Sequence, residues 1–166
     1  MMYITDNSRI LSREELSTPE EITNEIPLDK ESSKLIFGAR RSISQILHRQ
    51  DDRVIVVVGP CSIHDPKAAL EYAKLLKDFS SSVENELMVV MRVYFEKPRT
   101  TIGWKGLIND PRLDNSFKIN EGLRISRKLL KDIADLGMPT GTEFLDLISP
   151  QYVSDLVCWG AIGART

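Results

Sequence analysis

Apolar residues follow two different spacings along the first ninety residues of the chain. From Lys34 to Leu47 they recur every three or four positions, which predicts an amphipathic helix. Two continuous apolar runs follow, at 54–58 and 87–91, and the first consists only of Val and Ile. Such a β-branched run is typical of a strand covered on both faces. The pattern therefore predicts one helix followed by two buried strands.

A second helix is predicted between these two strands. Asp65 supplies an N-cap, and Pro66 suits the first helical turn. One side of the helix is apolar and is expected to face the core. Its residues are Ala69, Tyr72, Ala73, Leu76 and Phe79.

The last third of the chain repeats this order of elements. Asn120 is the predicted N-cap of a long helix that Gly137 closes. Short strands are expected around 140–144 and 161–163, and a short helix opens between them at Ser149. The long stretch between the second strand and the Asn120 helix is rich in Gly, Pro and Asp. Long loops in compact domains are usually functional.

Strands that alternate with helices favour a parallel sheet built from βαβ units. A complete (β/α)8 barrel has about eight strands and typically about 250 residues, so four strands indicate either a small open sheet or half a barrel. Residues 1–50 are predicted to form an N-terminal extension and helix. Residues 51–166 are predicted to form four βα units.

Composition narrows the class of protein. The 166 residues are 42% hydrophobic and 28% charged, which is typical of a globular domain. With a net charge of −2, nothing in the overall balance attracts nucleic acid or an anionic membrane. The sequence shows no membrane span or signal peptide. The two cysteines are far apart, which fits a reducing cytoplasm; Cys158 is predicted to lie in the core.

Chemically useful side chains follow the predicted strands, and in parallel α/β proteins catalytic groups gather at these carboxyl ends. They comprise a thiol, four cations and a carboxylate. Together they predict a site for a small substrate with more than one anionic group. The residues are Cys61, Arg92, Lys97, Arg99, Glu143 and Arg165.

Four longer strings carry a resemblance to a known family. They are Gly-Pro-Cys-Ser-Ile-His-Asp (59–65), Met-Arg-Val-Tyr-Phe-Glu-Lys-Pro-Arg-Thr-Thr (91–101), Gly-Trp-Lys-Gly-Leu-Ile-Asn-Asp-Pro (103–111) and Gly-Ala-Arg-Thr (163–166). In order and spacing they resemble the signatures of the type I 3-deoxy-7-phosphoheptulonate synthases. The resemblance runs from about Ser33 to the last residue.

The resemblance implies an α/β fold, the first half of a (β/α)8 barrel with an N-terminal helical extension. It also implies condensation of phosphoenolpyruvate with erythrose 4-phosphate, the first step of aromatic amino acid biosynthesis. In that mechanism a divalent metal polarises the aldehyde, the enol carbon attacks it, water adds and phosphate leaves. The metal's identity is open, and a homo-oligomer is expected for the full-length protein.

Roles for single residues come from the same resemblance. Cys61 would be a thiolate ligand of the metal. Arg92, Lys97 and Arg165 would hold phosphoenolpyruvate, with the backbone of Ala164 beside its phosphate. Glu143 would lie near the reacting enol carbon, although a structural ion pair is an equal alternative for it. The residues implied for erythrose 4-phosphate are Pro98, Arg99 and Thr100.

Several alternatives remain at the level of sequence. The family's other metal ligands, a histidine, a glutamate and an aspartate, lie in later strands that this sequence does not include. One alternative is therefore a truncated, inactive chain that only binds an anion or pairs with another polypeptide. Another is an octulosonate synthase, but the Lys-Pro-Arg-Thr loop at 97–100 argues against it. A Schiff base at Lys97 is a further alternative, but Arg99 nearby and the expected anionic substrate favour a charged lysine. The segment 146–151 resembles part of an effector pocket, without indicating which aromatic amino acid binds there. The resemblance also implies that residues 1–50, the N-terminal extension with Ile10, make oligomer or effector contacts.

Overall fold

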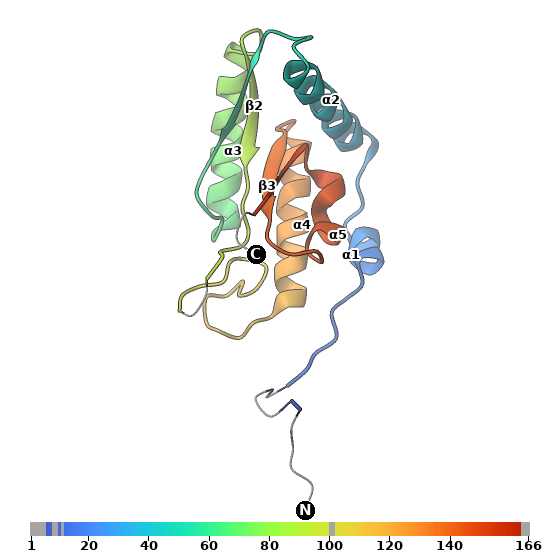
Figure 1. Ribbon diagram of the computed structural model, residues 1–166, viewed down its shortest axis with the longest axis vertical. Coiled ribbons are helices and arrows are strands. Elements are labelled where there is room, and N and C mark those ends of the chain that lie inside the picture. Colours follow the sequence, from blue (N-terminus) through green and yellow to red (C-terminus); the bar gives the residue numbers. More distant parts are fainter. Residues whose placement is uncertain (1–5, 8–9, 11, 100–101, 164–166) are drawn as a thin grey trace, which may run out of the picture.

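The computed structural model describes residues 6–7, 10, 12–99 and 102–163. They form a parallel four-stranded sheet in the order β1-β2-β3-β4, with helices along it (Figure 1). The elements are α1 (Pro19–Glu25), α2 (Lys30–Leu47), β1 (Val54–Val58), α3 (Pro66–Ser82), β2 (Leu87–Arg92), α4 (Ile119–Asp135), β3 (Thr140–Phe144), α5 (Pro150–Val153), the 3-10 turn η1 (Ser154–Leu156) and β4 (Trp159–Ile162).

The sheet is a curled half-barrel, as the predicted fold class requires. Neighbouring strands are parallel throughout, with Val54 opposite Leu87 in the first pair and Gly141 opposite Trp159 in the last. Short backbone hydrogen bonds continue the middle pairing, including one of 2.8 Å from the Val93 amide to the Gly141 carbonyl. All four strands therefore end at the same edge, where the loops after them meet.

β2 is buried on both faces because its side chains alternate between two cores. Val89 and Met91 join the core made with α3 and α4, whereas Met88 and Val90 pack with Ala39 and other residues of α2. Helix α2 crosses the far end of the sheet from the loops (Figure 1). It thus covers one face of β2 near the amino ends of the strands.

The prediction that β1 is covered on both faces was wrong. Val54 is 59% exposed, and Val57 and Val58 are 38% and 37% exposed. Within the described residues β1 pairs only with β2, so its outer edge and part of its faces meet no other element. The β-branched pattern correctly predicted the strand, but it carries no information on what lies against it.

The N-terminal segment contains a helix that the hydrophobic pattern did not predict. Thr18 caps α1 through a capping box, in which its side chain accepts from the Glu21 amide and Glu21 accepts from the Thr18 amide. α2 also starts earlier than predicted, because Asp29 caps it at the Ser32 amide. Both signals are short capping patterns rather than long apolar repeats.

Two details of the predicted helices need correction. Asn120 does not cap α4, which begins at Ile119; its side chain instead binds the N-terminal segment, accepting from the Ser17 amide and donating to the Glu15 carbonyl. Phe79 on α3 is 55% exposed and does not face the core. The capping of α3 by Asp65 and the burial of Cys158 were predicted correctly.

A buried arginine ties the N-terminal segment to the half-barrel. Arg127 of α4 is fully buried and donates to the carbonyls of Ile26 and Tyr152 and to both carboxylate oxygens of Asp155. Such bidentate, charge-assisted contacts fix position as well as charge. The segment before α2 is therefore held against α4 and α5.

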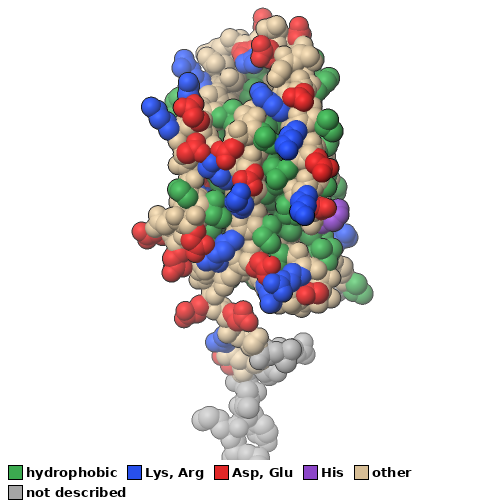
Figure 2. Space-filling model, turned by 180° about the vertical axis from the view of Figure 1, so that it is seen from behind, with side chains coloured by type: hydrophobic (Ala, Val, Ile, Leu, Met, Phe, Trp, Pro, Cys, Tyr) green, Lys and Arg blue, Asp and Glu red, His purple; other side chains and the backbone are tan. Residues whose placement is uncertain are grey.

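The surface carries both signs of charge. On the face seen in Figure 2, acidic and basic side chains are interspersed, with hydrophobic side chains exposed between them. No helix among the described residues is long and apolar enough to span a bilayer.

Candidate active site

The loops at the carboxyl ends of the strands enclose a pocket of about 320 Å³. It combines three cationic side chains, two carboxylates and an exposed thiol, from segments that follow β1, β2 and β3 or lie at their ends. This is where catalytic groups gather in parallel α/β folds. The lining residues are Cys61, Ser62, Arg92, Tyr94, Glu96, Lys97, Pro98, Arg99 and Glu143.

The exposed thiol lies directly beside an ammonium group. Lys97 Nζ is 3.0 Å from Cys61 Sγ and donates a hydrogen bond to it. This hydrogen bond and the charge of Lys97 lower the pKa of the Cys61 thiol from its usual value, and the charges of Arg92 and Arg99 act in the same direction. The site therefore favours a thiolate at position 61, which is the form that binds metals.

The guanidinium of Arg92 is held by the loop that follows β1. Its Nε donates to the Pro60 carbonyl at 3.0 Å, and Nη2 donates to the Gly59 carbonyl at 2.8 Å. This close packing requires a glycine at position 59, because a Cβ there would lie 2.6 Å from the Arg92 carbonyl oxygen. The β1 loop and the end of β2 thus form one unit that carries both Cys61 and Arg92.

The loop after β2 folds back on itself and so fixes Lys97. Glu96 and Gly106 form an antiparallel bridge, and the Lys97 amide donates to the Lys105 carbonyl at 3.0 Å. Lys105 Nζ in turn donates to the Arg99 carbonyl at 3.0 Å. The backbone between Lys97 and Arg99 is therefore braced from the returning half of the loop.

Gly106→Ala is expected to destabilise the protein by about 2 kcal/mol or more. Gly106 has φ +109°, and a Cβ there would meet the Phe95 carbonyl oxygen at 2.1 Å. Thermal or denaturant unfolding measures the loss. Gly38→Ala is the matched control, since Gly38 lies inside α2 with nothing within 4 Å of the added Cβ; we expect it to stabilise by about 0.5–1 kcal/mol. Equal effects at the two glycines would contradict the close approach in the loop.

Sequence reasoning missed three lining residues, Ser62, Tyr94 and Glu96. Val93 and Phe95 are buried at 0% and 2% exposure, so the extended chain after β2 turns every second side chain into the core. The intervening residues, Arg92, Tyr94 and Glu96, therefore share the face that lines the pocket. The period of two was visible in the sequence and pointed to Tyr94 and Glu96, whereas no such signal pointed to Ser62.

Glu96 occupies a half-buried position between two cavities. Burial raises the pKa of its carboxyl, and the negative charge of Asp146 raises it further. Asn109 Nδ2 and Ser149 Oγ donate to its two oxygens at 3.3 and 3.2 Å. It also lines a smaller pocket beside Leu16 of the N-terminal segment. Glu96 thus links the Lys97 loop to the start of α5.

The described residues include one side chain suited to bind a metal, but not the full set of ligands that a metal site needs. Cys61 is exposed and inclined to ionise, as a ligand must be. A catalytic metal such as zinc usually takes three protein ligands. No group of three or more His, Cys, Asp or Glu side chains suited to a metal occurs within residues 6–7, 10, 12–99 and 102–163. We therefore derive no chemical step through a metal from this geometry.

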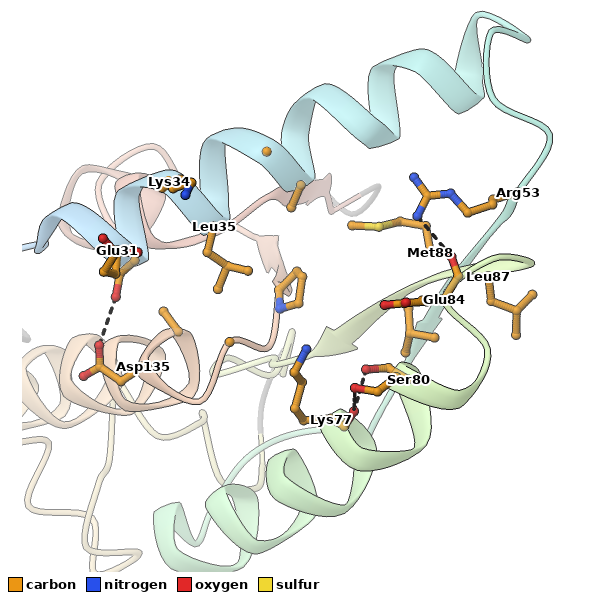
Figure 3. A pocket seen from close by; sticks show the side chains of 18 of the residues that line it. Glu31, Lys34, Leu35, Arg53, Lys77, Ser80, Glu84, Leu87, Met88 and Asp135 are labelled. Carbon is orange, nitrogen blue, oxygen red and sulfur yellow. Dashed lines mark hydrogen bonds between the residues drawn. The ribbon is translucent and has the colours of Figure 1, made fainter.

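A larger cavity, of about 740 Å³, lies at the opposite end of the sheet (Figure 3). It lies between α2, α3 and the last turn of α4, and charges of both signs, such as Lys34, Glu31 and Lys77, line it. None of the residues that the sequence singled out as chemical lines this cavity. Size therefore does not identify the site, and the smaller pocket at the strand ends is the candidate.

The structure brings together six of the predicted site residues. Cys61, Arg92, Lys97, Pro98, Arg99 and Glu143 all line the same pocket. Thr100, Ala164 and Arg165 lie outside the described residues. Proximity alone does not assign a role to any of them, so the roles implied by the resemblance remain predictions.

Comparison with known proteins agrees with the motifs. Residues 22–166 match the model of the DAHP synthetase I family. The chain is 57% identical over 161 residues to a phospho-2-dehydro-3-deoxyheptonate aldolase of Amycolatopsis methanolica, covering 97% of this chain and 79% of that protein. It is 56% identical over 166 residues to the Phe-sensitive aldolase of Escherichia coli K12, covering all of this chain and 47% of that protein.

A solved structure is similar as well. The phospho-2-dehydro-3-deoxyheptonate aldolase of Francisella tularensis superposes with a TM-score of 0.92 at 55% identity, covering 95% of this chain and 46% of that one. The chain thus spans about half the length of this structure and of the E. coli relative.

Proposed function

The chain belongs to the DAHP synthetase I family, and on that premise we propose that the complete protein containing it condenses phosphoenolpyruvate with erythrose 4-phosphate. The products are 3-deoxy-D-arabino-heptulosonate 7-phosphate and phosphate, and the reaction is the first step towards the aromatic amino acids. The observation that carries this proposal is the pocket at the strand ends, which sets Arg92, Lys97 and Arg99 around one cavity beside a thiolate-prone cysteine.

The cationic side chains suit the charges of both substrates. Phosphoenolpyruvate carries a carboxylate and a phosphate, and erythrose 4-phosphate carries a second phosphate. Arg92 is anchored at the end of β2, and we assign it with Lys97 to phosphoenolpyruvate. Arg99 lies two residues after Lys97 in the same loop, and its side chain is exposed. We therefore assign Arg99, together with Pro98, to erythrose 4-phosphate. Placing two anions in one cavity favours their reaction by proximity and charge neutralisation.

Cys61 and Glu143 are the proposed contributors to the chemical step. In the proposal Cys61, as its thiolate, would be one ligand of a divalent metal, and that metal would supply Lewis-acid polarisation of the aldehyde. Glu143, at the end of β3, faces the same pocket as Arg92 and is assigned to the neighbourhood of the reacting carbon. The contact between Lys97 and the Cys61 sulfur suits a charged ammonium, which favours anion binding over a Schiff base at Lys97.

The two anion sites can be separated by mutation. In the complete protein, Arg92→Ala and Lys97→Ala should raise KM for phosphoenolpyruvate about 10- to 150-fold, since each removes charge-assisted hydrogen bonds of about 1.5–3 kcal/mol. Arg99→Ala should raise mainly KM for erythrose 4-phosphate. Steady-state kinetics with each substrate varied in turn measure both effects.

Arg112→Ala is the matched control for these variants. Arg112 lies in the same loop but is exposed and paired with Glu121 outside the pocket, so both KM values should stay within about twofold of the wild type. If Arg99→Ala changed only KM for phosphoenolpyruvate, the assignment of the two anions would be wrong. If the wild-type protein formed no product from the two substrates, the proposed function itself would fail.

We also propose that an aromatic amino acid regulates the complete protein. The E. coli K12 relative is named Phe-sensitive. A Schizosaccharomyces pombe relative, 54% identical over 161 residues that cover 97% of this chain and 43% of that protein, is named tyrosine-inhibited. In this chain a pocket of about 150 Å³ contains Leu16 of the N-terminal segment together with Asp146 and Ile148. Glu96 lines both this pocket and the candidate active site, which supports communication between them. Calorimetric titration with Phe, Tyr and Trp tests for the effector.

A further inference from the structure

The Arg92 guanidinium is contacted along one edge and over one face. Its Nε and Nη2 donate to two consecutive carbonyls of the β1 loop, Pro60 and Gly59. The guanidinium carbon lies 5.4 Å from the centre of the Tyr94 ring and over its face. Among the described residues Nη1 has no hydrogen-bond acceptor. The edge formed by Nη1 and the remaining Nη2 proton is therefore the part available to a ligand in the pocket.

This arrangement suits bidentate recognition of an anion. A guanidinium binds a carboxylate or phosphate best through two parallel N–H groups in one plane. The two backbone carbonyls fix the near edge of the Arg92 group, but two hydrogen bonds along one edge still permit the plane to tilt. An aromatic face beneath the cation resists that tilt, because its negative quadrupole attracts the guanidinium.

Tyr94 is itself well placed to act on Arg92. Its carbonyl accepts from the Ile63 amide at 2.8 Å, which ties its backbone to the loop that carries Cys61. Val93 and Phe95 on either side are buried, so the direction of the Tyr94 side chain is set by the core. The backbone that carries the Tyr94 ring is therefore held in place beside Arg92.

We propose that Tyr94 is a positioning residue: its ring face orients the Arg92 guanidinium so that the outer edge binds the carboxylate or phosphate of phosphoenolpyruvate. The inference rests on the proposed function for the identity of the ligand, while the orientation of Arg92 rests on geometry alone. Tyr94 acts through Arg92, and the effect requires the electron-rich face of the ring rather than the phenolic hydroxyl.

The test compares side chains at position 94 in the complete protein. Tyr94→Leu is expected to raise both the calorimetric Kd and KM for phosphoenolpyruvate about 3- to 30-fold, the range of a cation–π contact. KM for erythrose 4-phosphate should change less than about twofold. Tyr94→Phe keeps the ring and should recover most of the affinity. Pentafluorophenylalanine at position 94 keeps the shape of the ring but removes its negative face, and it should behave like Leu.

Two further measurements separate orientation from packing. Tyr72→Leu alters a half-buried tyrosine on α3 outside the pocket and should leave phosphoenolpyruvate affinity unchanged. In an Arg92→Ala background, Tyr94→Leu should have no further effect on Kd.

Equal affinity for Tyr and Leu at position 94, or equal loss for Phe and Leu, would overturn the proposal. So would pentafluorophenylalanine binding as well as Phe. Because Kd is measured without turnover, a wild-type protein that binds phosphoenolpyruvate but makes no product would refute the proposed function and leave this inference standing.

Discussion

Cys61→Ala in the complete protein is expected to abolish tight binding of a divalent metal and to lower turnover more than about 100-fold. Cys61 is exposed in the candidate pocket, and Lys97 lowers the pKa of its thiol, so it is available as a thiolate ligand. Loss of outer partners of metal ligands alone typically costs 10- to 100-fold in affinity or activity, and loss of a direct ligand should exceed that. Metal content by atomic spectroscopy, measured beside the rate of phosphate release, tests both effects.

Cys158→Ala is the matched control. Cys158 is buried in the core, where its Sγ donates to the Thr140 carbonyl and desolvation raises the pKa of its thiol to about 12. It therefore stays protonated at neutral pH and cannot serve as a thiolate ligand. The control should lose some stability and retain its metal. A Cys61→Ala protein with normal metal content and normal rate would remove Cys61 from the site.

The sequence predicted the strands and α3 well because their signals are local. The Val-Ile run at 54–58 and the Asp65-Pro66 cap each fix an element within a few residues, and the structure places both where predicted. Because parallel strands end at a common edge, the sequence also predicted that Cys61, Arg92 and Glu143 lie close together. The structure places all three in one pocket.

Long-range packing explains most of what the sequence did not show. Whether the faces of β1 are covered depends on elements distant in the chain, and so does the exposure of Phe79 on α3. Asn120 was a reasonable N-cap, but its side chain binds the N-terminal segment more than a hundred residues away. Tyr94 is different: the local alternation of apolar and polar residues after β2 places it on the same face as Arg92, so this part of the site was predictable from the sequence.

Residues 1–166 produced as a separate polypeptide are expected to self-associate and to show no turnover. β1 and β4 each pair on one side only within the described residues, and unpaired strand edges template association. The exposed hydrophobic side chains of Val54, Val57 and Ile162 lie on these two strands. Turnover should fail separately, because one thiolate in the described residues cannot hold a catalytic metal.

Light scattering coupled to size-exclusion chromatography should therefore show oligomers or aggregates, with no phosphate released from the two substrates and added metal. Val57→Lys on β1 should shift the distribution towards monomer, because a charge on an edge strand opposes pairing. Phe37→Lys is the control: Phe37 is 70% exposed, more than Val57, but it lies on helix α2 and not on a strand, so it should leave the distribution unchanged. If the separate polypeptide were a monodisperse monomer, the open edges would not drive association. If it also consumed phosphoenolpyruvate only when erythrose 4-phosphate was present, residues 1–166 would be sufficient for catalysis, and the need for further ligands would be refuted.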